Sequence, residues 1–177
     1  MPAPRKMTAN SLNALKGWPQ MNAVDYHASV DSSMSGSLPI LAGSVVSLNS
    51  SGNFILGVGT TNVMPMFMFN NSDDPDVSND GGDASADVGV WIPISPTGQA
   101  LALVAVGAYE LVSTAYVAGS YAPNAALSSD LSGSDAGKLQ AGTIGTDMIV
   151  GIVSRGVVDN GYGKSALAFW PFPIFPG

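Results

Sequence analysis

The sequence predicts an all-β protein: a small β-barrel or β-sandwich with an extended N-terminal arm and an aromatic, proline-rich C-terminal tail. The 21 glycines and 12 prolines are typical of short strands joined by many turns. Apolar runs rich in Val, Leu and Ala alternate with polar turns, and the longest run, Gln99–Val112, has no charge before Glu110. Closing the strands into a barrel or sandwich would remove vulnerable edges.

We expect three parts: an arm over residues 1–37, a β-rich body over residues 38–168 and an apolar tail over residues 169–177. The chain of 177 residues is long enough to bury a core, and it has no cysteines to form disulfides. The arm shows no sustained periodicity, although Ala9–Leu15 could form one or two helical turns. The sequence is compatible with two alternatives for these residues: an arm that crosses a neighbouring subunit, or a disordered terminus.

The body begins with the clearest hairpin of the chain. Ser44–Leu48 and Phe54–Leu56 flank the turn Asn49–Asn53, whose sequence Asn-Ser-Ser-Gly-Asn suits a tight connection. The next strand is expected over Val58–Phe69. In its apolar end, Met64, Met66 and Met68 would share one face, facing either the core or a subunit interface, while Phe67 and Phe69 take the other.

The later strands follow the same logic. Gln99–Val112 is expected to be a central strand buried on both faces and bent or bulged at Gly107. A second hairpin unit, weakly similar to the first, and two closing strands follow, at Tyr121–Leu127, Lys138–Gly142, Met148–Val153 with its extension Arg155–Val158, and Ser165–Phe169.

The tail Trp170–Gly177 is uncharged and has a proline at every second or third position. Proline lacks the N–H that a strand donates to its neighbour, so we expect the tail not to continue a sheet. Such an apolar tail would fold back onto the body or dock into a neighbour.

The number and distribution of charged residues limit the kinds of partner that we expect. Charged residues make up 11% of the chain against 46% hydrophobic residues, so we expect much of the surface to be covered by protein. The net charge is −7, and half of the positive charge lies at Arg5, Lys6 and Lys16. An acidic body does not favour nucleic acid, and no apolar run is long enough to span a membrane.

One acidic loop contains residues that could bind a metal ion. Oxygen donors at Asp76, Ser78, Asp80 and Asp87 follow the spacing of an EF-hand calcium loop, with a glycine at Gly81. The match is partial because the last ligand is Asp instead of Glu and neither flank looks helical. A solvated surface loop is the alternative, so we predict no cofactor.

Catalytic motifs are lacking. His27 is the only histidine, and its neighbours do not suggest a dyad or triad. Glu110 is the only glutamate, and we expect it to pair with Lys164 or Arg155. An acid-dependent hydrolase would need two facing carboxylates, and no spacing among the twelve aspartates selects a pair. We therefore do not expect an enzyme.

Several segments resemble the small capsid decoration (cement) proteins of tailed bacteriophages. The resemblance covers most of the body and is carried by turn and strand segments: Leu41–Phe54, Met64–Phe67 followed by Asn70–Asp76, Ala108–Leu111, Ser120–Asn124, Val150–Gly156 and Ala168–Pro171. It implies a virion protein, made in the host cytoplasm, that sits on the outside of an icosahedral head. It also implies a homotrimer that clamps the major capsid protein against internal pressure.

From the two ends of the chain we predict the contacts with capsid or sister subunits. The predicted contact residues are Arg5, Lys6, Leu12, Leu15, Trp18, Trp170, Phe172 and Phe175. The alternative function is a carbohydrate-binding or host-attachment module, in which Trp91, Tyr121 and Tyr162 would form a stacking platform.

Overall fold

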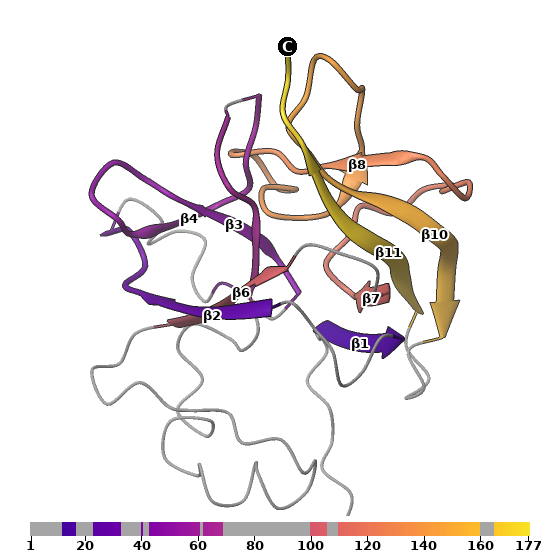
Figure 1. Ribbon diagram of the computed structural model, residues 1–177, viewed down its shortest axis with the longest axis horizontal. Helices are drawn as coiled ribbons and strands as arrows, with labels where there is room; N and C mark the ends of the chain where they lie inside the picture. The colour runs from indigo at the N-terminus through magenta and orange to yellow at the C-terminus, as the bar shows by residue number, and fades with distance from the viewer. Residues whose placement is uncertain are drawn as a thin grey trace, which may run out of the picture.

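The computed structural model (Figure 1) describes residues 12–16, 23–32, 40, 43–60, 62–68, 100–105, 110–159 and 165–177. These residues form two antiparallel sheets without an α-helix among them, which confirms the all-β class. The six-stranded sheet contains, in spatial order, β1 (Leu12–Lys16), β7 (Glu110–Ser113), β11 (Ser165–Ile174), β10 (Ile149–Asp159), β8 (Ala126–Ser128) and β9 (Gln140–Ala141). The five-stranded sheet contains β2 (Ala23–Ala28), β6 (Ala100–Ala105), β5 (Met66–Met68), β3 (Val45–Leu48) and β4 (Phe54–Leu56).

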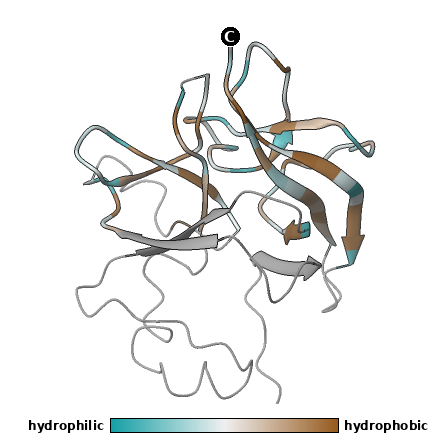
Figure 2. Ribbon diagram, viewed as in Figure 1, coloured by the Kyte–Doolittle hydropathy of each residue, from teal (hydrophilic) through white to brown (hydrophobic). Residues whose placement is uncertain are grey.

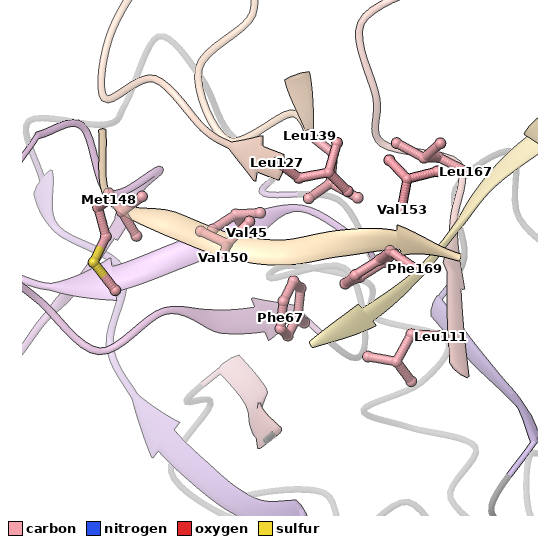
Figure 3. Packing of buried hydrophobic residues seen from close by; sticks show 11 residues of the cluster. Val45, Phe67, Leu111, Leu127, Leu139, Met148, Val150, Val153, Leu167 and Phe169 are labelled. Carbon is pink, nitrogen blue, oxygen red and sulfur yellow. The ribbon is translucent and has the colours of Figure 1, made fainter. Parts of the chain in front are cut away.

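The two sheets share one hydrophobic core. Val45 and Phe67 from the five-stranded sheet belong to the same buried cluster as Leu111, Val153 and Phe169 from the six-stranded sheet. The rings of Phe67 and Phe169 approach across the sheets with centroids 5.3 Å apart, and Figure 3 shows the cluster converging from both sides. Hydrophobic residues dominate β10, the longest strand (Figure 2). Burial of this apolar surface is the main force that holds the sheets together.

The methionine-rich strand β5 is buried on both faces. Phe67 points into the shared core, whereas Met66 and Met68 join a second buried cluster with Val46 and Phe54. The predicted alternation of Met and Phe is therefore confirmed at these three positions. The option of a subunit interface on the Met face is wrong for Met66 and Met68, because both side chains are buried within the chain.

Both predicted hairpins are present, as β3–β4 and β8–β9. In the first, the Asn49 side-chain oxygen accepts hydrogen bonds from the backbone N–H groups of Ser51 and Asn53, each at 2.9 Å. Gly52 has a φ of +79°, a conformation that glycine adopts without steric cost. Local turn chemistry thus accounts for this hairpin.

The loop after β8 connects the two sheets through backbone hydrogen bonds. Ser129 accepts from the N–H of Gly59 at 2.9 Å, and Gly137 accepts from the N–H of Val45 at 2.7 Å. Gly57, with a φ of +75°, lies against the backbone of Asp130, so closely that a Cβ on Gly57 would sit 1.8 Å from the Asp130 oxygen. Only glycine fits this approach.

The apolar run Gln99–Val112 is not one central strand. It contributes β6 to the five-stranded sheet and β7 to the six-stranded sheet, while residues 106–109 lie outside the described part. Fourteen residues exceed the usual strand length, and a chain that changes sheets can serve both layers of a shared core.

The N-terminal region also differs from the prediction. Instead of helical turns within Ala9–Leu15 and an arm leaving the body, β1 pairs with β7 and β2 pairs with β6 along their lengths. Backbone pairing with an apolar strand satisfies N–H and C=O groups that an isolated arm would leave to water. The described parts of this region therefore belong to the sheets.

The C-terminal segment continues the sheet, contrary to expectation, because β11 includes Pro171 and Pro173. Val153 exchanges backbone hydrogen bonds with the segment before β8, donating to Ala125 at 2.8 Å. By antiparallel alternation its neighbour Ile152 faces β11, where it opposes Trp170. The same alternation turns the backbone of Pro171 away from β10, so its missing N–H removes no hydrogen bond to β10.

Candidate functional site

An ion pair with a buried carboxylate lies on the six-stranded sheet. Glu110 on β7 is 2% exposed, and its carboxylate accepts hydrogen bonds from Nε and Nη2 of Arg155, both at 2.8 Å. Ser154 Oγ donates a third hydrogen bond to Oε1 at 2.6 Å. The predicted pairing of Glu110 with Arg155 is confirmed, while Lys164 lies outside the described residues.

A β-bulge in β10 brings both partners to Glu110. Val153 pairs with Phe169 and Gly156 with Ala168, so Ser154 and Arg155 are two extra residues on this strand. In a regular strand neighbouring side chains point to opposite faces, whereas here both reach the same carboxylate. Gly156 ends the bulge with a φ of +85°. This bulge was not predicted from the sequence, where Ser-Arg-Gly at 154–156 within an apolar run is the signal for it.

The geometry keeps Arg155 charged. Its hydrogen bonds to Glu110 raise the pKa of Arg155; burial opposes this rise, and the charge of Glu110 adds to it. A two-point contact between guanidinium and carboxylate also fixes the orientation of the side chain. Arg155 nevertheless remains accessible, since 48% of its side chain is exposed.

Three aromatic side chains are exposed in and just after β11 of the same sheet. Trp170 is 41% exposed, Phe172 53% and Phe175 49%. Their segment, residues 165–177, contains no charged residue. Large apolar side chains exposed together on a segment without charge are unusual for a surface that faces water permanently. These three predicted contact residues are thus accessible, whereas their role as contacts stays a prediction.

The other predicted contact residues are less informative. The backbone of Leu12 and Leu15 lies in β1 at the edge of the six-stranded sheet, and Arg5, Lys6 and Trp18 lie outside the described residues. The strands that carry Leu12, Leu15 and Trp170, β1 and β11, belong to one sheet and are separated by β7.

The candidate calcium loop also lies beyond the described part, which includes none of Asp76, Ser78, Asp80 and Asp87. Among the residues that are described, no cluster of three His, Asp or Glu side chains is placed to hold a metal ion. Helices long and apolar enough to cross a membrane are likewise lacking in the described ranges.

The predicted stacking platform can be examined at one position. Tyr121 is partly buried, its hydroxyl donates to the backbone oxygen of Val117 at 2.6 Å, and its ring meets Tyr116 edge-on at 6.1 Å. Burial, followed by the charges of Tyr116 and Asp135, raises the pKa of Tyr121. The other two residues of the predicted platform, Trp91 and Tyr162, are not among the described residues.

The lone histidine, His27, lies in β2, where its backbone is paired with Leu101 of β6.

The fold and this site define an all-β protein of two antiparallel sheets, with a half-exposed arginine bound to a buried glutamate near exposed aromatic residues of β11. Comparisons of the chain with models of known protein families, with curated proteins and with solved structures found no match.

Proposed function

We propose that this chain is a structural virion protein that binds the outer surface of an icosahedral bacteriophage head as a homotrimer. It stabilises the contacts between capsomers of the major capsid protein against internal pressure. The observation that carries the proposal is the row of exposed aromatic residues Trp170, Phe172 and Phe175. Aromatic side chains are enriched in protein interfaces, where they bury large areas at a small cost in conformational entropy.

Other features support the same function. Charged residues are scarce at 11%, which suits a surface that is largely covered in an assembly. We infer that the two sheets form a β-sandwich, which would give the aromatic strand a rigid support. A trimer binds through three linked sites, so modest individual contacts combine into strong attachment. Arg5, Lys6 and Trp18 stay predicted contacts of the N-terminal region.

The proposal predicts that replacing the three aromatic residues strongly weakens attachment. A variant that carries Trp170→Ser, Phe172→Ser and Phe175→Ser should bind heads lacking the protein about a hundredfold more weakly. Each substitution removes an aromatic side chain that would be buried in the complex. Cosedimentation measures the bound fraction at increasing protein concentration. The mass of the free protein should equal three chains of 18.0 kDa each.

A matched control replaces Met64 and Leu131 by Ser, because these side chains are exposed to a similar extent, 46% and 39%, on other segments. The control should bind heads like the wild type, and both variants should keep the circular dichroism spectrum of the folded protein. Binding of wild-type protein to glycans but not to heads would overturn the proposal in favour of host attachment.

A further inference from the structure

Arg155 presents unused hydrogen-bond donors at a fixed position. Nε and Nη2 bind the Glu110 carboxylate side-on, and Ser154 holds the same carboxylate. The Nη1 nitrogen makes no hydrogen bond within the described part of the chain, and the side chain is 48% exposed. The outer edge of the guanidinium is therefore ordered in advance of any partner, which lowers the entropy cost of binding.

This edge adjoins the aromatic strand. Leu111 on β7 pairs with Phe169 on β11, and both side chains lie in the shared core. Continuing the antiparallel register by one residue sets Glu110 opposite Trp170, on the other face of the sheet. Trp170 and Arg155 thus both neighbour the same buried carboxylate.

Arg155 carries a charge, whereas the strand segments next to it carry none. The first half of β10, Ile149–Ser154, and the whole segment 165–177 contain no ionisable side chain. Lys138, another described cation, is already paired with Asp135 at 2.8 Å in the loop between β8 and β9. On β10 and β11, Arg155 is therefore the one cation that a partner covering Trp170 would meet.

We propose that Arg155 is the polar anchor of the Trp170 docking face and receives a carboxylate from the partner protein. This inference rests on the proposed capsid-binding function and names the chemistry of that partner. Docking over Trp170 removes water from the outer guanidinium edge, and buried donors without an acceptor weaken binding. A carboxylate matches both the charge and the two-point geometry of that edge.

The test exchanges the shape of the cation while keeping its charge. Arg155→Lys retains a positive group near Glu110 but loses the outward N–H donors of the guanidinium. It should weaken binding to heads by about tenfold or more. The control Lys138→Arg makes the reverse exchange at a cation away from the docking face and should leave binding unchanged. Isothermal calorimetry with heads lacking the protein measures both.

A second measurement identifies the acceptor. Heads whose surface carboxylates are converted to neutral amides should bind wild-type protein about tenfold more weakly and bind Arg155→Lys no more weakly than untreated heads do. If Arg155→Lys loses thermal stability, the double variant Glu110→Gln, Arg155→Gln removes both charges together, and it too should bind weakly while remaining folded.

The outcomes separate the two proposals. Wild-type protein that fails to bind heads overturns the proposed function, and with it this inference. Wild-type binding that Arg155→Lys or the double variant matches within about twofold overturns the role of Arg155 and leaves the capsid-binding function standing. Full binding to amidated heads overturns the carboxylate partner.

Discussion

Gly57→Ala is expected to lower the free energy of unfolding by about 3–5 kcal/mol, which is enough to unfold much of a marginally stable domain. Two costs combine at this position. An alanine at a φ of +75° is strained, and its Cβ would lie 1.8 Å from the backbone oxygen of Asp130. Because backbone atoms cannot rotate away like a side chain, the loop that connects the two sheets has to move.

Gly52→Ala is the matched control for this effect. Gly52 has a nearly identical φ of +79°, but no atom lies within 4 Å of the Cβ it would carry. Only the backbone strain applies, so we expect a loss of about 1–2 kcal/mol. Urea denaturation followed by tryptophan fluorescence gives both values. Equal losses for the two variants would show that the approach between Gly57 and Asp130 does not constrain the fold.

Arg155→Met is expected to cost about 2–3 kcal/mol of folding stability at neutral pH. The substitution keeps an unbranched apolar stem but removes the guanidinium that binds the buried carboxylate of Glu110 at two points. Breaking a fully buried ion pair costs roughly 3–5 kcal/mol, and the smaller value reflects that Arg155 is half exposed. Denaturation of the folded protein in the absence of heads measures this effect separately from binding.

The double variant Glu110→Gln, Arg155→Met provides the decisive comparison. It removes the buried charge together with the Arg155 guanidinium, so it should be more stable than Arg155→Met alone despite carrying one more substitution. Ser154 remains available to donate a hydrogen bond to the glutamine oxygen. A double variant as unstable as the sum of its single variants would argue against coupling between Glu110 and Arg155.

Part of the candidate site is readable from the sequence. Trp170, Phe172 and Phe175 stand out because an uncharged aromatic segment is unusual at a protein surface, and the structure exposes all three. Glu110 predicts a cationic partner, Lys164 or Arg155, because a lone acid in an apolar strand needs a cation, and the structure selects Arg155 among the described residues. The role of Ser154 depends on the bulge in β10, which involves its pairing with β11 and was not predicted.

Proline illustrates where reasoning from the chain alone fails. Pro171 predicts the end of a sheet if both sides of the strand must be paired. In the structure its backbone faces away from β10, so the missing donor has no consequence there. Whether a proline interrupts a strand pair therefore depends on which of the two neighbouring strands its backbone faces.

The sequence by itself determined the all-β class, the turn of the β3–β4 hairpin at Asn49 and the alternation of Met66, Phe67 and Met68. These features arise from interactions between residues close along the chain, so local patterns specify them. The tertiary structure alone decided that Gln99–Val112 divides between two sheets and that β1 and β2 join their edges. Strand partners are chosen by burial and hydrogen bonding between distant segments, which no local pattern records.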